Sequence, residues 1–189
     1  MKFLLYGDKK SPFLNAIKRK AEKDGIETEI TQEYQKNMHY VADWETCNVN
    51  HQLPYEFNIE YPIPSVTEAV MRIINKCTDL KGKTVLVIGR GNSTSKLPKL
   101  LLRQDATVII AHSRTENITE LLLVADIVIN ASPLELRYIR DKDLIIDIPI
   151  RKDDTEPYSN GRAYVGGKVI ARECTDIIVE RMNDIQECE

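Results

Sequence analysis

The chain has 189 residues, enough for one large domain or two small ones, and its 42% of hydrophobic residues can bury a substantial core. Its 26 lysines and arginines against 29 aspartates and glutamates leave a net charge of −3, which argues against a nucleic acid partner because nucleic-acid binding needs a clearly basic face. No apolar stretch approaches the roughly 18 residues of a membrane span, and the short apolar start, soon followed by charged residues, predicts a first strand and not a signal peptide.

The first sixty or so residues predict a small α/β unit. Ser11 is a typical helix cap, and Pro12 fits the first helical position, where its missing N–H costs nothing. Gly25 can end this helix. The other elements predicted here are two strands, a short helix and a connecting loop, over residues 3–6, 27–31, 31–38 and 46–64.

From Ser65 onward, helices and strands alternate regularly. Ser65 and Glu68 form the sequence pattern of a capping box at the start of a helix. Strands alternating with helices argue for βαβ units, so the predicted fold class is α/β with a Rossmann-type parallel sheet. The predicted strands cover residues 84–88, 107–111, 127–129 and 144–148, and the helices cover 65–74, a leucine-rich segment after the glycine turn, 118–124 and 174–182.

A glycine-rich turn follows the first strand of this sheet. Gly89 allows a tight turn, Gly91 lets a ligand approach the backbone, and the next helix offers free N–H groups to a phosphate. Ser95 replaces the third glycine of the usual fingerprint, so the motif draws its weight from its place between a strand and a helix. The predicted cofactor contacts in this turn are Gly89, Arg90, Gly91 and Asn92.

The second strand of the sheet ends in His112-Ser113-Arg114-Thr115. NAD-binding enzymes usually place an acidic residue here to bind the ribose 2′-hydroxyl. Ser113 and Arg114 instead offer a hydroxyl and a cation, which suit a 2′-phosphate, so NADP is favoured over NAD. The alternative is that Arg114 and Arg90 are solvated loop charges. We interpret His112 as a loop or packing residue and not as a catalytic base.

The cysteines are far apart in the sequence. They form no C-x-x-C pair of the kind that holds zinc, so we expect no metal site, free thiols and a reduced, cytoplasmic setting. No triad pattern surrounds the first of them, which we interpret as a structural thiol. The four are Cys47, Cys77, Cys174 and Cys188.

Several of these segments resemble one family, the methylenetetrahydrofolate dehydrogenase/cyclohydrolase proteins. Residues 80–92, LKGKTVLVIGRGN, are similar to the family segment L-x-G-K-x-x-x-V-I-G-R-S-N. Residues 112–117, HSRTEN, continue the match, and further similar segments follow in order at 125–128, 145–148 and 160–166. The chain is identified as a shortened, divergent member of this family.

The resemblance implies an activity and its site. It implies NADP-dependent oxidation of 5,10-methylenetetrahydrofolate to 5,10-methenyltetrahydrofolate in one-carbon metabolism, with cyclohydrolase activity that gives 10-formyltetrahydrofolate. It also implies a folate substrate and a homodimer. On this resemblance Lys18 is the catalytic lysine and Asp43 the folate-binding aspartate. The position of Lys18 in the sequence favours this role, whereas composition alone would favour a solvent-facing lysine on a charged helix face.

The chain also departs from the family. Leu14 stands where the family has a tyrosine, and the loop that closes over folate is absent. The middle segment with V-Q-L-P-L-P is missing too, and Gln52-Leu53-Pro54 could be a displaced copy of it, in which case Asp43 loses its assignment. Two alternatives follow: an inactive NADP-binding relative that acts as a binding or regulatory module, and a dehydrogenase without cyclohydrolase activity.

The expected domain organisation follows the same resemblance. Residues 1–64 form a reduced N-terminal α/β domain for folate binding and catalysis, 65–175 an NADP-binding Rossmann domain, and 176–189 a C-terminal helix.

Overall fold

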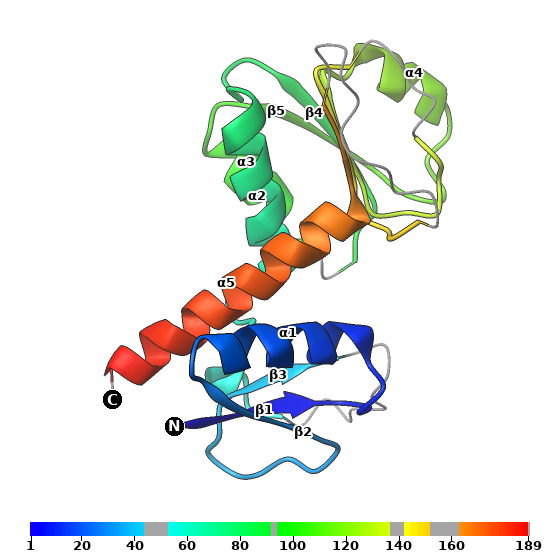
Figure 1. Ribbon diagram of the computed structural model, residues 1–189. Helices are drawn as coiled ribbons and strands as arrows, with labels where there is room; N and C mark the ends of the chain where they lie inside the picture. Colours follow the sequence, from blue (N-terminus) through cyan, green and yellow to red (C-terminus); the bar gives the residue numbers. More distant parts are fainter. Residues whose placement is uncertain (44–52, 92–93, 137–141, 152–162, 189) are drawn as a thin grey trace. The chain divides into compact units, whose positions relative to one another are not determined.

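The structure is a computed structural model that describes residues 1–43, 53–91, 94–136, 142–151 and 163–188 (Figure 1). The chain divides into two compact units: unit 1 is Met1–Ser65 with Arg172–Glu189, and unit 2 is Val66–Ala171. Each unit has its own parallel sheet. The predicted α/β fold class with a Rossmann-type parallel sheet is confirmed.

Unit 1 is built on a three-stranded parallel sheet in the order β2-β1-β3. The central strand β1 is apolar on both faces, because successive side chains of a strand point to opposite sides. Phe3 and Leu5 pack in one core cluster with residues of α1 and α5, whereas Leu4 packs in a second cluster with Tyr40. The elements of unit 1 are β1 (Lys2–Tyr6), α1 (Pro12–Lys23), β2 (Glu27–Thr31), β3 (Tyr40–Ala42), the 3-10 helix η1 (Tyr55–Phe57) and most of α5 (Gly167–Cys188).

Helix α1 begins and ends as the sequence predicts. The Ser11 hydroxyl accepts the backbone N–H of Leu14 at 3.3 Å, and Pro12 is the first helical residue. Gly25, just beyond the helix, has a φ of 76°, which favours glycine. The helix turns Leu14, Ile17 and Ala21 into the core, and all three are buried.

Residues 31–38 do not form the predicted helix. Asn37 has a φ of 62°, a left-handed conformation that cannot continue a helix. Tyr34 and Met38 instead pack against the cluster around Leu4 and Tyr40, so tertiary packing outweighs a weak local preference. In the segment predicted as a loop, residues 53–64 contain only the short η1, and the earlier part lies outside the described residues.

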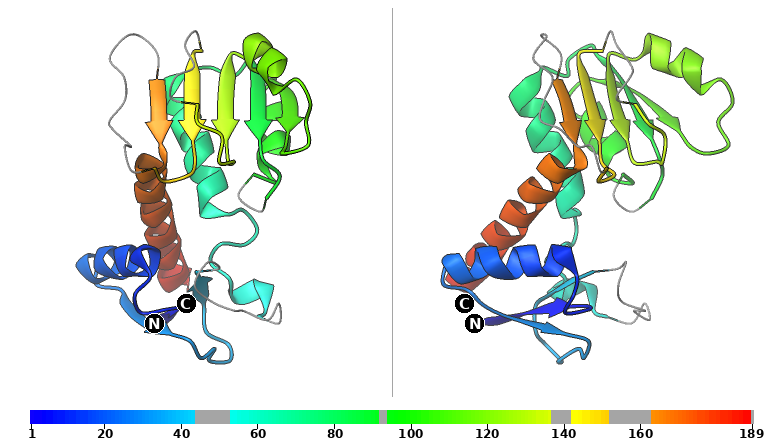
Figure 2. Two further views of the ribbon diagram at one scale, coloured as in Figure 1. Left: turned by 90° about the vertical axis from the view of Figure 1, so that its right-hand side faces the viewer. Right: turned by 45° about the vertical axis from the view of Figure 1, so that its right-hand side comes forward.

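Unit 2 is built on a five-stranded parallel sheet in the order β5-β4-β6-β7-β8, and Figure 2 shows its arrows pointing the same way. All the strands predicted for this region are confirmed, whereas β8 was missed. The chain moves from β4 outward to β5 and then crosses to β6 on the other side of β4, which creates a topological switch point. The elements are α2 (Ser65–Cys77), β4 (Thr84–Ile88), α3 (Leu97–Leu102), β5 (Thr107–Ala111), α4 (Ile118–Val124), β6 (Ile127–Asn130), β7 (Leu144–Asp147) and β8 (Ala163–Gly166).

Helices cover both faces of this sheet, with α2 and α3 on one face and α4 on the other (Figures 1 and 2). On the α4 face, strand register aligns one row of core side chains across the sheet. Leu86 lies opposite Val128, Val128 opposite Ile145, and Ile145 opposite Tyr164. This row packs with Leu121 and other residues of α4. No helix in the described ranges is long and apolar enough to cross a bilayer.

The start of α2 is capped by a different residue from the one predicted. The carboxylate of Glu60 accepts both the backbone N–H and the hydroxyl of Ser65, each at 2.6 Å. Glu68, the expected partner, forms an ion pair with Arg72 at 2.7 Å. The capping-box prediction is therefore wrong, because the backbone N–H of Ser65 donates to the carboxylate of Glu60, from the preceding loop, and not to that of Glu68.

The last helix is longer than the expected one. Helix α5 starts at Gly167, directly after β8, and residues from Arg172 onward group with unit 1. A Cβ at Gly167 would lie 2.6 Å from the carbonyl oxygen of Ile148, so only glycine fits this sharp change from strand to helix. Ile178 and Met182 complete the core cluster that contains Phe3.

Candidate functional site

In unit 2 the carboxyl ends of neighbouring strands meet at one edge of the sheet. The N–H of Gly89 donates to the carbonyl of Ala111 at 2.8 Å, and the N–H of Ala131 donates to the carbonyl of Ile88 at 2.7 Å. The segments that follow β4, β5 and β6 are therefore adjacent. Open parallel sheets bind ligands at this edge, at the switch point between such strands.

Gly89 is required by both its conformation and its surroundings. Its φ of 117° lies in a region that L side chains avoid. A Cβ at this position would lie 3.1 Å from Cβ of Ala131 and 3.3 Å from the Ala131 carbonyl oxygen. At Gly91, in contrast, a Cβ would meet nothing within 4 Å. The two glycines therefore differ: the first allows the turn, and the second leaves the backbone open to a ligand.

The chain after Gly91 folds back on itself. The N–H groups of Thr94 and Ser95 both donate to the Gly91 carbonyl at 3.0 Å. Helix α3 begins only at Leu97, is six residues long and has no side-chain cap at Lys96. The leucine-rich helix predicted here is thus a short one that follows a turn. Asn92 lies outside the described residues.

A compact turn follows β5. The hydroxyl of Thr115 accepts the backbone N–H of His112 at 2.9 Å, and Nδ1 of His112 accepts the backbone N–H of Arg114 at 3.1 Å. His112 is therefore a loop-fixing residue, as its predicted role implies, and Ser113 and Arg114 are exposed. Within the described ranges, the guanidinium groups of Arg90 and Arg114 form no ion pair. Both cations can therefore meet an anionic ligand.

A buried polar cluster that sequence reasoning missed lies at the same edge. The Asp147 side chain is fully buried at the end of β7. Its carboxylate accepts hydrogen bonds from Nδ2 of Asn130 at 2.8 Å, the Tyr164 hydroxyl at 2.9 Å and Nε of Arg151 at 2.6 Å. The hydrogen bond to Asp147 raises the pKa of Arg151 further. An aspartate that ends an otherwise apolar strand is the signal that could have indicated this cluster, because a buried charge needs partners.

In unit 1, Asp43 lies at the carboxyl edge of the three-stranded sheet. It is 7% exposed, and its carboxylate accepts a hydrogen bond from the Ser11 hydroxyl. The backbone N–H of Asp43 donates to the Tyr6 carbonyl at 2.9 Å. Because Ser11 also caps α1, this aspartate is tied to the beginning of the helix that carries Lys18.

Lys18 follows Ser11 by seven residues, so it lies on the same helix face about 10 Å further along the axis. Its side chain is 40% exposed, and its Nζ lies 3.8 Å from Oε1 of Glu22. In the described part of unit 1, the ion pair of Lys18 is thus with Glu22 and not with Asp43. The roles of Lys18 and Asp43 stay predictions.

Three further sequence expectations concern this region. Leu14, at the position of the family's tyrosine, is fully buried in the core. Gln52, the competing match to the family, lies outside the described residues, while Leu53 packs beside Tyr40. Cys47 also lies outside the described residues.

The described cysteines are Cys77, Cys174 and Cys188, and all three are free. Burial raises the pKa of the Cys174 thiol to about 12, which keeps it protonated and unreactive. The described residues contain no group of three or more histidine, cysteine or carboxylate side chains that could hold a metal ion.

Comparison with known proteins points to one family. Residues 64–179 match the model of the tetrahydrofolate dehydrogenase/cyclohydrolase NAD(P)-binding domain. The bifunctional protein FolD of Clostridium novyi is 31% identical over 125 residues, which cover 63% of this chain and 41% of that protein. FolD of Rickettsia akari is 41% identical over 96 residues, which cover 48% of this chain and 32% of that protein. The chain thus spans less than half the length of these curated relatives.

Solved structures share the fold over a longer stretch. FolD from Campylobacter jejuni has a TM-score of 0.71 and 16% identity, covering 97% of this chain and 88% of that one. The Trypanosoma brucei enzyme, complexed with NADP cofactor and an inhibitor, has a TM-score of 0.72 and 17% identity, covering 98% and 86%. At these identities, the likeness is one of fold.

The two glycines of the turn allow a matched test of the local geometry. Gly89→Ala should lower the free energy of unfolding by about 1–3 kcal/mol, because it combines a strained φ with a close approach to Ala131. Gly91→Ala should change it by no more than about 0.5 kcal/mol. Denaturant unfolding of both variants would measure the difference, and equal effects would contradict the assigned roles.

Proposed function

This chain belongs to the tetrahydrofolate dehydrogenase/cyclohydrolase family, and on that premise we propose that it oxidises 5,10-methylenetetrahydrofolate to 5,10-methenyltetrahydrofolate with NADP. The observation that carries the proposal is the family match over residues 64–179, which includes the glycine turn and the turn after β5. In this reaction, the bound cofactor accepts a hydride from the folate. The chain's own residues bind the two ligands and assist proton movement.

The carboxyl edge of unit 2 has the features that a dinucleotide needs. The open backbone at Gly91 gives the pyrophosphate room to approach, and the sharp turn at Gly89 brings the chain to it. The adenosine half would then lie toward β5, where Ser113, Arg114 and Arg90 are exposed. A hydroxyl and two cations favour the 2′-phosphate of NADP over the 2′-hydroxyl of NAD.

We assign the folate chemistry to unit 1, with Asp43 binding the substrate and Lys18 polarising it and assisting proton transfer. Two observations support this assignment. Asp43 is a carboxylate held at the carboxyl edge of the small sheet by Ser11, and Lys18 projects from the helix that Ser11 caps. The Lys18 side chain is 40% exposed and its Nζ has a long ion pair with Glu22, at 3.8 Å, so the ammonium can turn to a substrate.

A second candidate function is dehydrogenase activity without cyclohydrolase activity. Leu14 favours it, because this side chain is fully buried in the core and supplies no hydroxyl beside Lys18. An inactive NADP-binding module is the remaining alternative, and the comparisons with bifunctional enzymes do not favour it.

We also propose that the protein is a cytoplasmic homodimer that pairs through β5. β5 is an edge strand of the five-stranded sheet, and its Ile110 is 52% exposed. Leu102, on the neighbouring α3, is 58% exposed. Exposed apolar side chains on a sheet edge favour pairing with a second copy. The free thiols at Cys77, Cys174 and Cys188 support a reducing compartment.

The proposed activity can be measured directly. With methylenetetrahydrofolate and NADP, the protein should produce the near-ultraviolet absorbance of reduced nicotinamide. Lys18→Ala should lower kcat by about 100-fold or more with little change in NADP affinity, because the lysine acts on the folate. Lys23→Ala, on the same helix but exposed, is the matched control. NADP binding without any absorbance change in the wild type would instead support the binding-module alternative.

The assignment of the 2′-phosphate predicts a difference between the two cofactors. Arg90→Ala should weaken NADP binding by about tenfold or more through the loss of a charge-assisted hydrogen bond, and should barely change NAD binding. Arg103→Ala removes an exposed arginine beyond the end of α3 and should change neither affinity. Isothermal titration calorimetry gives both affinities. Equal losses for NADP and NAD would refute the assignment.

The dimer proposal predicts the mass in solution. Light scattering should give twice the chain mass of 21.7 kDa for the wild type. Ile110→Lys should give the single-chain mass, because a buried ammonium at the pairing edge is strongly unfavourable. Leu123→Lys alters a still more exposed apolar residue on α4, at 75% against 52% for Ile110, and should stay dimeric. A wild-type protein that is monomeric throughout would contradict the proposal.

A further inference from the structure

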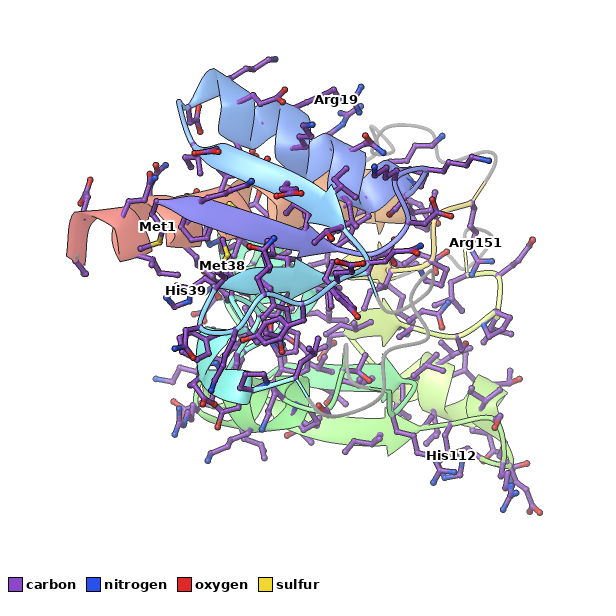
Figure 3. The ribbon with its side chains drawn as sticks, turned by 90° about the horizontal axis from the view of Figure 1, so that it is seen from below. Met1, Arg19, Met38, His39, His112 and Arg151 are labelled. Carbon is purple, nitrogen blue, oxygen red and sulfur yellow. The ribbon has the colours of Figure 1, made fainter. Side chains whose placement is uncertain are left out.

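The cluster around Asp147 is built from three strands of unit 2 and the segment after β7. Asn130 ends β6 and lies directly opposite Asp147 in the sheet register. Tyr164 comes from β8, and Arg151 follows Asp147 by four residues. The side chain of Asp147 is 0% exposed and that of Arg151 16%, so solvent screens their ion pair only weakly. Figure 3 shows Arg151 and His112 on the side toward which the strands of unit 2 point.

The same side chains hold the loop that follows β6. Oδ1 of Asn130 accepts the backbone N–H of Ser132 at 3.0 Å and its hydroxyl at 2.6 Å. Nδ2 of Asn130 donates to the carbonyl of Leu134 at 2.7 Å. Nη2 of Arg151 donates to the same carbonyl at 2.6 Å, and Nη1 donates to the Pro133 carbonyl at 3.3 Å. Residues 131–134 are thus fastened at several points although they form no helix or strand.

This loop is also in contact with the glycine turn. A side chain at Gly89 would meet both Cβ and the carbonyl oxygen of Ala131, so the two backbones lie as close as glycine allows. The loop therefore cannot move toward the turn. On its other side, Arg151 and Asn130 hold it in place. A continuous set of contacts runs from the buried Asp147 carboxylate to the turn that receives the dinucleotide.

We propose that Arg151 is a positioning residue that sets the binding site for the nicotinamide half of the cofactor by fixing the loop 131–134. The proposal rests on the proposed binding of NADP. A dinucleotide crosses the carboxyl edge at the switch point, with its adenosine half on the side of the second strand, here β5. Its other half then lies on the side of β6 and β7, beside the loop that Arg151 holds.

The geometry needs an arginine and not merely a positive charge. The guanidinium reaches Asp147 through Nε while its Nη atoms reach the carbonyls of Pro133 and Leu134. A planar fork of fixed donors can serve a carboxylate and two carbonyls at once, whereas a lysine ammonium is a single point of charge. Arg151→Lys should therefore keep the charge near Asp147 but release the loop.

The test compares a whole dinucleotide with its adenosine half. Calorimetry would measure the affinity of wild type, Arg151→Lys and Arg151→Met for NADP and for adenosine 2′,5′-bisphosphate, which lacks the nicotinamide. Both variants should bind NADP about tenfold more weakly, within the range that substitutions in packed networks reach, and should bind the bisphosphate as the wild type does. A general structural defect would weaken both ligands.

The exposed ion pair between Lys83 and Asp143, at 2.6 Å, supplies the matched control. Lys83→Met breaks an ion pair in the same unit, outside the loop contacts, and should change neither affinity. Equal weakening of both ligands by Arg151→Lys, or no weakening of NADP by either variant, would overturn the proposal. Should Arg151→Met fail to fold, as judged by circular dichroism, Arg151→Lys alone decides. Wild-type protein that binds the bisphosphate but not NADP, or neither, would overturn the proposed function itself.

Discussion

Parallel strand pairing is the constraint on which both units depend. Parallel pairing brings the carboxyl ends of all strands to one edge of the sheet. Polar residues that follow different strands therefore become neighbours in space although they are far apart in the sequence. In unit 2 this edge gathers Gly89, the turn after β5 and the cluster around Asp147. In unit 1 it gathers Ser11 and Asp43. The same constraint requires apolar strands covered on both faces, which is why β1 and β4 are almost wholly hydrophobic.

The two sides of the edge in unit 2 have different electrostatic properties. Beside β5, Arg90 and Arg114 are exposed and form no ion pair among the described residues, so their charge is available to an anion. Beside β7, the charge of Arg151 is neutralised by a buried carboxylate, and its remaining donors hold backbone carbonyls. One side is thus suited to recognise a phosphate, and the other to keep a loop rigid. Rigid support of this kind is what a reacting group needs, because small displacements lower reaction rates strongly.

Unit 1 is compact because residues of α5 complete its core. Ile178 and Met182 from α5 pack with Phe3 and Leu14 in one cluster. Leu14 is therefore committed to packing, and a phenol at this position would have to bury its hydroxyl. Within unit 1, position 14 therefore serves the core.

Local features of the sequence determined most of the secondary structure and the glycine turn of the candidate site. Ser11, Pro12 and Gly25 place α1, the apolar runs place the strands, and the turn at Gly89 can be identified from its glycines, because caps, periodicity and φ preferences act over a few residues. Only the tertiary structure decided which side chains donate hydrogen bonds to the buried carboxylate of Asp147. Its partners lie 17 residues away in both directions, at Asn130 and Tyr164, and meet it only because β7 pairs with β6 on one side and β8 on the other. The irregular path of residues 31–38 has the same origin, since packing of Tyr34 and Met38 against the cluster around Leu4 outweighed a local preference.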